Sequence, residues 1–479
     1  MRMKQMGAPI YEAILQHARK QPLSMHVPGH KNGTVFPSIG EKFRDVLSLD
    51  LTELRGLDDL HAPNGVIEKA EQLLSEYYQS EQSWLLVGGS TVGNLAMICA
   101  ACHPGDRVLV QRNSHRSVLN GIRLAGAHPV FLGPEVDEKS GLATAPSEET
   151  VALALKKYPD AKALLLTNPN YYGQTVHLQP LVSVAHTYGI PVLVDEAHGA
   201  HFALGPPFPA DALQCGADAV VQSAHKTLPA MTMGAFLHVQ GKRIHGEEIA
   251  HWLRLFQSSS PSYPIMASLD LARYFISQLT QADIEAIIRD GDRIRASLQS
   301  IKGLSIVEQS DSNAYACIDP LKVTLQLDGT LNGFEWARAL ENEGVYPELA
   351  DPHHVLLILP LARFEGSKLI KAVEKSIHVI KPAEQSFELN FLGFPRLSCP
   401  ERFNNRETTK VPLDQAAGAV SAQEVTPYPP GVPLILQGER ITEAEIKALR
   451  HWHQAGGRFQ SGHDVVHKGI DVFIDLKSS

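Results

Sequence analysis

The sequence predicts an α/β fold with a large, mostly parallel sheet, a small α+β domain and an extra C-terminal domain. Strand-like and helix-like segments alternate from about residue 83 to 240, as a parallel sheet requires. A long helical region, Ile265 to about Ser300, then leads into mixed strands and helices, with one strand expected at Tyr315–Ile318. The composition shifts again from about residue 385, and a helix is expected at Leu413–Ala419. We expect an N-terminal arm at 1–60, a large domain at 61–264, a linking helix and small domain at 265–384, and a C-terminal domain at 385–479.

Length and charge limit the classes of function. At 479 residues the chain is too long for one simple core, and its 44% hydrophobic and 20% charged residues are those of an ordinary globular protein. The formal net charge of −9 argues against nucleic acid or an anionic membrane as partner and leaves room for a cationic substrate. Tyr11–Arg19 has an amphipathic pattern where a leader peptide would be apolar, and no stretch is apolar enough to span a bilayer. We expect a cytoplasmic protein.

The cysteines and histidines suggest neither disulfides nor a metal site. Five cysteines, an odd and sparse set, do not make a disulfide framework. Cys99, Cys102 and His103 match the haem attachment pattern C-x-x-C-H, but they end an apolar helix, so we interpret both cysteines as buried hydrophobes. Two histidines in the loop Met25–Gly33 have no carboxylate or cysteine at ligand spacing beside them. We therefore expect no bound metal.

The large domain contains six predicted strands: Trp84–Val87, Arg107–Gln111, Pro129–Leu132, Ala163–Thr167, Pro191–Val194 and Ala219–Gln222. Helices such as Ser147–Tyr158 and Leu181–Tyr188 lie between them, and Met233–Val239 is one more strand that runs back. Ligands of parallel sheets bind at the carboxyl ends of the strands. Polar residues that should share one site follow the predicted strands: Ser90, His115, Asn168, Asp195 and Lys226.

A lysine and an aspartate at two strand ends indicate the cofactor. Lys226 follows one apolar run, and Asp195 follows another about thirty residues upstream, within the spacing of one βαβ unit. This pair fits pyridoxal phosphate, because the lysine can form a Schiff base and the aspartate can keep the pyridine nitrogen protonated. The segment Gly88-Gly89-Ser90-Thr91, where a strand turns into an apolar helix, supplies amide N–H groups for the phosphate.

Together these motifs resemble a known family. Four segments and the glycine turn carry the resemblance: Asn113-Ser114-His115, Asp195-Glu196-Ala197-His198, Ser223-Ala224-His225-Lys226 and Pro427-Tyr428-Pro429-Pro430-Gly431-Val432-Pro433. They are similar to the ornithine/lysine/arginine decarboxylases of fold type I, the aspartate-aminotransferase fold, over nearly the whole chain. The resemblance implies pyridoxal 5'-phosphate as cofactor, with contacts from Gly89, Ser90, Thr91, His115, Asp195, Ala197, His198, Ser223, His225 and Lys226.

The resemblance also implies roles for individual residues. Lys226, His225 and Asp195 are the expected catalytic residues. Asp195 would pair with the ring nitrogen, and Lys226 or His225 would return a proton to the substrate carbon. Ser90, Ser223 and His225 are expected to hold the phosphate.

Three further segments have a structural or an active-site interpretation. His115 would stack over the cofactor ring, but its position also fits a polar residue that starts the helix Arg116–Leu124. Leu57–His61 fits either a capping turn before the helix that begins near Gly65 or a part of the substrate entrance. The loop His26–Gly33 is expected to cross to a neighbouring subunit, since fold-type-I sites are completed by loops of a partner. We expect a homodimer or an assembly of dimers.

The C-terminal segment is expected to contribute to substrate recognition. Pro427–Pro433 resembles the C-terminal domain of these decarboxylases, although Gln437 stands where a proline is expected. We expect Glu439 to bind the distal cation of the substrate, because a buried guanidinium or ammonium needs a carboxylate. Alternatively, Glu439 opens a helix at Ile441–Ile446, and the acid is Asp351 or comes from another subunit.

The expected function is α-decarboxylation of a basic amino acid, with L-arginine converted to agmatine and CO2. Lysine and ornithine have the same reacting end as arginine, so the sequence leaves the choice among the three substrates open. It also leaves open whether Arg363 contacts the substrate carboxylate. Transamination, α-oxoamine synthesis, aldol cleavage or a catalytically silent scaffold are the alternatives. His225 directly before Lys226 and the C-terminal segment favour decarboxylation. The extra N-terminal domain of acid-stress decarboxylases has no counterpart here, so we expect a role in polyamine biosynthesis.

Overall fold

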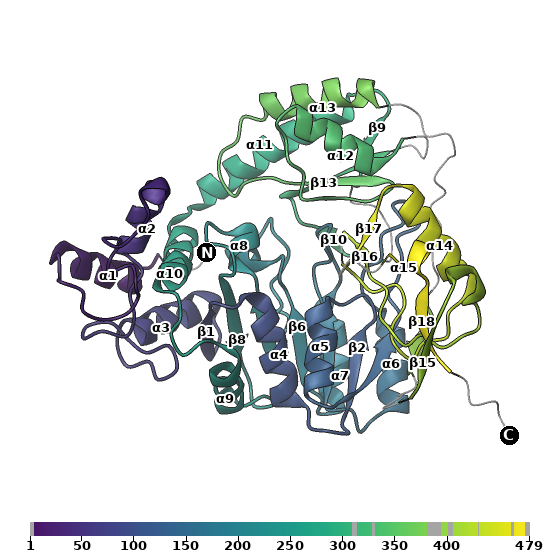
Figure 1. The fold of residues 1–479 in the computed structure, drawn as a ribbon, viewed down its shortest axis with the longest axis horizontal. Coiled ribbons are helices and arrows are strands. Elements are labelled where there is room, and N and C mark those ends of the chain that lie inside the picture. Colours follow the sequence, from purple (N-terminus) through teal and green to yellow (C-terminus); the bar gives the residue numbers. More distant parts are fainter. Residues whose placement is uncertain are drawn as a thin grey trace.

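The computed structural model describes residues 4–308, 314–327, 331–380, 394–400, 406–429, 431–460 and 464–474. Within these residues the chain forms one large sheet, a smaller four-stranded sheet and three two-stranded ribbons. Figure 1 shows the large sheet with the small sheet and its helices above it, the N-terminal helices at one side and the yellow C-terminal elements at the other. The α/β fold predicted from the sequence is confirmed.

The large sheet has eight strands in the order β1-β8-β7-β6-β4-β2-β3-β14. Their bounds are β1 Gln82–Leu86, β2 Arg107–Gln111, β3 His128–Leu132, β4 Ala163–Thr167, β6 Val192–Asp195, β7 Ala219–Gln222, β8 Ala235–Val239 and β14 Leu397–Ser398. The strands β3, β2, β4, β6 and β7 pair in parallel, whereas β8, β1 and β14 join through antiparallel pairs. The six predicted strands and the returning strand are all present, with bounds shifted by one or two residues at most.

Both faces of the large sheet are covered, because successive side chains of its strands enter two different cores. Leu164 packs in the core that includes α6 and α7, and its neighbour Leu165 packs in the core that includes α4, α5 and α9. The bounds are α4 Gly89–Ala101, α5 Arg116–Leu124, α6 Glu148–Lys157, α7 Leu178–Thr187 and α9 Gly246–Phe256. Burial on both faces explains why the strands are apolar throughout rather than alternating.

The N-terminal part contains α1 (Pro9–Arg19), a 3-10 helix (Ser38–Phe43), α2 (Arg44–Ser48) and α3 (Val66–Tyr78). The Asp58 carboxylate accepts hydrogen bonds from the backbone N–H groups of Gly65, Ile67 and Glu68 at 2.8, 3.0 and 3.3 Å. These groups have no partner inside a helix, so Asp58 caps the start of α3. The interpretation of Leu57–His61 as a capping turn is confirmed.

The predicted helical region that links the domains consists of two helices, α10 (Tyr263–Gln278) and α11 (Gln281–Gln299). Leu279 and Thr280 have extended backbone between them. Thr280 starts α11 with a reciprocal cap, because its hydroxyl accepts the N–H of Asp283 and the Asp283 carboxylate accepts the N–H of Thr280 at 2.9 Å. The T-x-x-D pattern was the signal for this break.

The small sheet is antiparallel, in the order β12-β13-β11-β9. Its elements are β9 Leu304–Ile306, β11 Lys322–Leu327, β12 Leu349–Ala350 and β13 His354–Ile358, with helices α12 Gly333–Asn342 and α13 Ser367–Val379. The strand predicted at Tyr315–Ile318 is shorter, and this β10 (Cys317–Ile318) pairs with β5 (Gln174–Thr175) instead of the small sheet. The segment between β9 and β11 of the small domain therefore pairs with the segment that follows β4 in the large domain.

The C-terminal part has its own small apolar core. Its elements are β15 Thr408–Val411, β16 Pro427–Tyr428, α14 Glu443–Gln454, β17 Arg458–Phe459, α15 Val465–Lys468 and β18 Ile470–Phe473. The helix predicted at Leu413–Ala419 is wrong beyond a 3-10 turn at Leu413–Gln415, because the chain turns at Gly418, whose φ is +81° and whose N–H donates to the carbonyl of Ile441 at 2.8 Å. The predicted boundary at residue 385 lies outside the described residues. Among the helices that the structure describes, none has the length and apolar character to cross a membrane.

Candidate active site

The residues singled out from the sequence gather at the carboxyl edge of the large sheet. Asp195 is the last residue of β6, and Lys226 lies in the short helix α8 (Ala224–Thr227) directly after the neighbouring β7. The helix α4 begins after β1, which runs in the same direction as β7 because both pair antiparallel with β8. Three strand ends thus deliver an amine, a carboxylate and a helix N-terminus to one edge.

Lys226 points into a buried aromatic and imidazole environment. Its Nζ lies 3.1 Å from Nε2 of His198 and 5.6 Å from the ring centre of Tyr171. Burial lowers the pKa of Lys226, while the negative charges of Asp195 and Glu348 oppose this shift. Tyr171 therefore lines the site. A lysine with a lowered pKa has more of the neutral amine needed for covalent chemistry.

Asp195 is 2% exposed and holds two hydrogen bonds. Nδ2 of Asn94 donates to its Oδ2 at 2.8 Å, and the N–H of Ala197 donates to its Oδ1 at 3.2 Å. Asn94 also donates to the hydroxyl of Ser117 at 3.0 Å. Both bonds fix the position of the carboxylate, which can pair there with a protonated ring nitrogen. The partnership of Asn94 with Asp195 was missed, although a buried asparagine in an apolar helix was a signal.

The start of α4 can bind an anion. The N–H of Gly89 donates to the carbonyl of Met233 at 2.7 Å, and no side chain caps the rest of the first turn, so the remaining N–H groups and the positive helix end are available to an anion. Ser223 donates to the hydroxyl of Ser90 at 2.8 Å, which places both hydroxyls beside this turn, and Thr91 is exposed. An added Cβ on Gly93 would lie 2.3 Å from a methyl of Val221, so the glycine lets α4 approach β7 closely.

Two histidines of the site have fixed ring orientations. His115 starts α5, and its Nδ1 accepts the N–H of Ser117 at 3.2 Å, so the helix-starting interpretation is confirmed. Burial lowers the pKa of His115, and the charges of Asp195 and Lys226 also act on it. Its stacking on the cofactor stays a prediction. Nδ1 of His225 donates to the carbonyl of Gly234 at 3.0 Å, which leaves Nε2 as the acceptor of the neutral ring.

His198 connects this group to the small domain. Its Nδ1 lies 3.2 Å from Nζ of Lys322, the first residue of β11, while its Nε2 faces Lys226. Burial, followed by the charges of Lys226 and Lys322, holds the pKa of His198 well below its usual range. Lys322 is not among the site residues predicted from the sequence. It alternates along the strand with apolar residues, as Thr324 and Gln326 do, so the pattern gave no signal of its burial.

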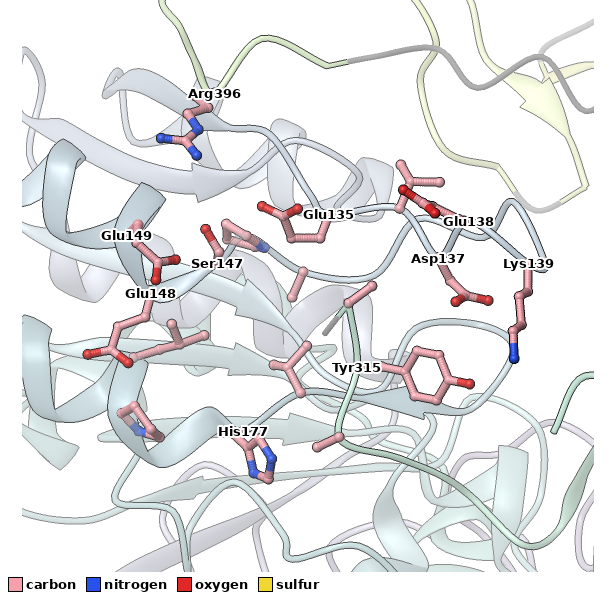
Figure 2. A pocket seen from close by; sticks show the side chains of 18 residues that line it. Glu135, Asp137, Glu138, Lys139, Ser147, Glu148, Glu149, His177, Tyr315 and Arg396 are labelled. Carbon is pink, nitrogen blue, oxygen red and sulfur yellow. The ribbon is translucent and has the colours of Figure 1, made fainter. Parts of the chain in front are cut away.

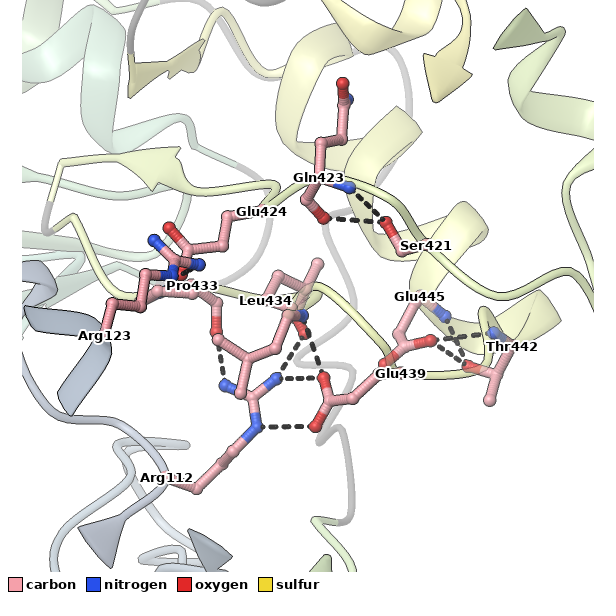
Figure 3. A network of polar contacts seen from close by, with 11 residues as sticks. Arg112, Arg123, Ser421, Gln423, Glu424, Pro433, Leu434, Glu439, Thr442 and Glu445 are labelled. Carbon is pink, nitrogen blue, oxygen red and sulfur yellow. Dashed lines mark hydrogen bonds and ion pairs between the residues drawn. The ribbon is translucent and has the colours of Figure 1, made fainter. Parts of the chain in front are cut away.

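Glu439 lies in a different network, which joins the C-terminal segment to the large domain (Figure 3). Its carboxylate accepts hydrogen bonds from Nε and Nη2 of Arg112 at 3.2 and 2.7 Å and from the N–H of Leu436 at 2.9 Å. Arg112, which follows β2 and is 5% exposed, also donates to the carbonyls of Pro433 and Leu434. The alternative in which Glu439 opens a helix is wrong, because the helix α14 begins three residues later with Thr442 as its cap. The contact of Glu439 with substrate stays a prediction.

Two other candidates also have partners within the chain. The guanidinium of Arg363 is largely exposed and pairs with Asp290, with Nε 2.6 Å from Oδ2. The carboxylate of Asp351 is buried against His354 and the hydroxyl of Tyr172, and the nearby His354 is the main group holding the pKa of Asp351 to about 2 against the opposing effect of burial. Neither side chain belongs to the group around Lys226.

A cavity of about 890 Å³ lies elsewhere, lined by the segment after β3, the start of α6 and residues 314–316 (Figure 2). Acidic side chains such as Glu135, Glu138 and Glu148 line it, with His177 and Arg396. Lys226, Asp195 and His198 do not line this cavity. The cavity is therefore separate from the polar group at the sheet edge.

That group fits the cofactor predicted from the sequence. A cofactor with a phosphate, a ring nitrogen and an aldehyde needs an anion site, an ionised acid and a neutral amine. The uncapped turn of α4 with Ser90 and Ser223 would hold the phosphate, Asp195 would hold the ring nitrogen, and Lys226 would bind the aldehyde carbon. The three features lie along β1, β6 and β7 at one edge.

Comparison with known proteins agrees with this site. The family model described as Orn/Lys/Arg decarboxylase, major domain, matches residues 8–366, and the one described as Orn/Lys/Arg decarboxylase, C-terminal domain, matches residues 395–461. The chain is 43% identical to the uncharacterized protein YaaO of Bacillus subtilis, over 99% of this chain and 100% of that one. It is 31% identical to arginine decarboxylase of Bacillus anthracis over 99% of both chains. The lysine decarboxylase of Francisella novicida superposes with a TM-score of 0.81 at 19% identity, over 98% of this chain and 81% of that one.

Proposed function

This chain belongs to the Orn/Lys/Arg decarboxylase family, and from that premise we propose that it converts L-arginine to agmatine and CO2. Membership makes it a pyridoxal-phosphate-dependent amino-acid decarboxylase. Arginine is favoured by the full-length similarity to arginine decarboxylases, at 31–32% identity, against 22–24% for the lysine decarboxylases among its relatives. The observation that carries the proposal is the convergence of Lys226, Asp195 and the start of α4 at one sheet edge.

The residues of the site divide the chemistry between them. Bound pyridoxal phosphate supplies an electron sink for the carbon that loses CO2. Asp195, held in place by Asn94 and the N–H of Ala197, stabilises the proton on the ring nitrogen that makes this sink effective. Lys226 binds the cofactor, and Lys226 or His225 returns a proton to the carbon.

The distal cation of the substrate needs an acidic partner near Lys226. To bind the substrate, the carboxylate of Glu439 would have to release Arg112. The carboxylate of Asp351 is already hydrogen-bonded to His354. Glu348, just before β12, is the small-domain acid whose charge acts on both Lys226 and Lys322. We therefore propose Glu348 as the group that recognises the cation, with Glu439 as the alternative.

We further propose that the reaction takes place in the cytoplasm, in polyamine biosynthesis, and in a homodimer. The five cysteines are all described and all free, which fits a reducing compartment. The N-terminal arm exposes several large apolar side chains, as a surface that is covered by a second subunit does.

Release of labelled CO2 from carboxyl-labelled arginine, lysine and ornithine tests the proposal. We expect the highest kcat/KM for arginine, the amine as product and no release by Lys226→Ala. A higher kcat/KM for lysine or ornithine would overturn the substrate assignment. Formation of a keto acid without CO2 would overturn decarboxylation in favour of transamination.

A further inference from the structure

Three potential metal ligands meet in the C-terminal part, in a group that does not include Lys226. They are His453, in the last turn of α14, and Asp464 and His467, which cap and follow the start of the short helix α15. Each side chain offers one ligand atom, and these atoms all lie within 4.8 Å of one another. Because the residues come from two helices, no short ligand spacing marks them in the sequence, and they depart from the expectation of no bound metal.

The packing of the two helices brings the three side chains together. Ile446 and Leu449 of α14 and Val465 of α15 belong to the same apolar core. Oδ1 of Asp464 accepts the N–H of His467 at 3.2 Å, so the carboxylate caps α15. Its other oxygen, Oδ2, lies 2.7 Å from Nδ1 of His467. The helix cap therefore uses one carboxylate oxygen and leaves the second one beside the imidazole.

Capping explains the contact of Asp464 with His467, but it does not explain the third side chain. The half-buried ring of His453 meets the ring of His467 edge-on, with ring centres 4.8 Å apart and an angle of 77°. It also lies nearly parallel to the ring of Phe459, at 6.4 Å and 9°. Among the residues that the structure describes, neither ring nitrogen of His453 has a hydrogen-bond partner. These nitrogens are therefore available to an ion.

The donor set indicates the class of ion. Imidazole nitrogens suit zinc, copper, iron and nickel, whereas magnesium and calcium prefer oxygen ligands alone. Tetrahedral zinc with ligands at about 2.0–2.1 Å needs its ligand atoms about 3.3 Å apart. Ligand atoms within 4.8 Å of one another can reach this spacing by small side-chain rotations. Two imidazoles and one carboxylate thus suit zinc and leave its fourth position to water.

The ligands lie beside the contact between the C-terminal part and the small domain. Nδ2 of Asn332, which caps α12, donates at 2.8 Å to the carbonyl of Ala455, the residue that ends α14. The rings of Phe334 and Trp452 meet edge-on, with centres 5.3 Å apart. A metal ion bound to His453 would therefore fix the helix end that makes this contact.

We propose that His453, Asp464 and His467 bind one Zn²⁺ ion, which joins the end of α14 to α15 and so holds the helix end that contacts the small domain. The ion takes no part in the reaction at Lys226. The inference goes beyond the proposed function and does not depend on it.

Equilibrium dialysis of the full-length, cofactor-loaded chain against buffered Zn²⁺, followed by metal analysis, tests the proposal. We expect the wild type to bind one zinc ion that His453→Gln and His467→Gln bind at least about tenfold more weakly, because each variant lacks a ligand. His378→Gln removes an exposed histidine of α13 and is the matched control, which should bind zinc as the wild type does. If His453→Gln does not fold, His467→Gln decides alone, since its side chain is 67% exposed.

Equal zinc binding by the wild type, His467→Gln and His378→Gln would mean adventitious ions only and would overturn the proposal. X-ray absorption of the bound zinc should show nitrogen and oxygen ligands at about 2.0–2.1 Å. A sulfur ligand would place the ion at a cysteine instead and would also overturn it.

Amide hydrogen exchange tests the joining of the two helices. Zinc should slow exchange in α15 and in the last turn of α14 of the wild type, but not in His467→Gln. Exchange that zinc leaves unchanged in the wild type would overturn the joining. Because none of these experiments measures CO2, failure of decarboxylation would leave their result standing.

Discussion

Asp195 receives two hydrogen bonds in the folded chain, from Asn94 at 2.8 Å and from the N–H of Ala197 at 3.2 Å. Both hold the carboxylate in place at the end of β6, where it can pair with a protonated ring nitrogen. We expect Asp195→Asn to retain bound cofactor but to lower kcat about 100-fold or more, because a neutral amide cannot stabilise that charge. Cofactor absorbance and turnover on one sample check this. Near-normal turnover would mean that Asp195 is not the ring partner.

The two acids proposed for the distal cation can be separated by neutral isosteres. We expect Glu348→Gln to lower kcat/KM for arginine by about 10-fold or more, since a charged contact is lost in the transition state. Glu439→Gln should change kcat/KM only a few-fold, because its carboxylate binds Arg112. It should instead lower the stability of the chain by about 1–3 kcal/mol. Loss of activity in Glu439→Gln with stability unchanged would restore Glu439 as the recognition residue.

At the scale of elements, a buried carboxyl joins α3 to the edge strand β1. Oε1 of Glu71 accepts the N–H of Leu85 at 3.1 Å, and burial raises the pKa of Glu71 from 4.5 to about 8. Below pH 4.5 the group is protonated in the folded and the unfolded chain. Between the two values the unfolded chain has released the proton and the folded chain has kept it, so stability falls as pH rises.

We therefore expect Glu71→Gln, which keeps an acceptor for Leu85, to gain stability relative to the wild type as pH rises from about 5 to 8. The difference should reach a few kcal/mol, with about 1.4 kcal/mol per pH unit as the upper limit. Urea unfolding of both proteins across this range measures it. A difference that does not depend on pH would show that Glu71 is ionised in the folded chain.

The elements that the sequence predicted best are those whose signal is local. The strands of the large sheet are apolar runs that end in polar residues, and the residues at their ends are the site. What was missed depends on pairs far apart in the chain. Asn94 and Asp195 are 101 positions apart, His198 and Lys322 are 124 apart, and Arg112 and Glu439 are 327 apart. No periodicity or spacing encodes such contacts, because they form only when the sheet, the small domain and the C-terminal segment are packed together.

At the scale of the whole molecule, the N-terminal arm exposes a set of large apolar side chains. Ile39 is 97% exposed and Met6 90%, and Leu23, Met25 and Val35 are exposed as well. A water-exposed surface of this kind is unfavourable unless a partner covers it, and we predict that the partner is a second copy of the chain.

Ile39→Glu should shift the sedimenting species from dimer toward monomer and lower activity, because a charge would be buried in the interface. Val379→Glu, at an exposed position of α13 in the small domain, is the control and should leave the dimer intact. Sedimentation velocity at several protein concentrations measures both. A wild-type chain that is a fully active monomer would contradict the dimer.

The most direct test of the account is borohydride reduction of the cofactor-loaded enzyme, followed by peptide mapping. The account predicts one stable cofactor adduct, on Lys226, whose amine lies at the end of β7 beside His198. Lys322 should stay unmodified, since its buried Nζ lies on the far side of the His198 ring, 3.2 Å from Nδ1. An adduct on a different lysine, or none in a sample that binds cofactor and turns over arginine, would contradict the assignment of the site.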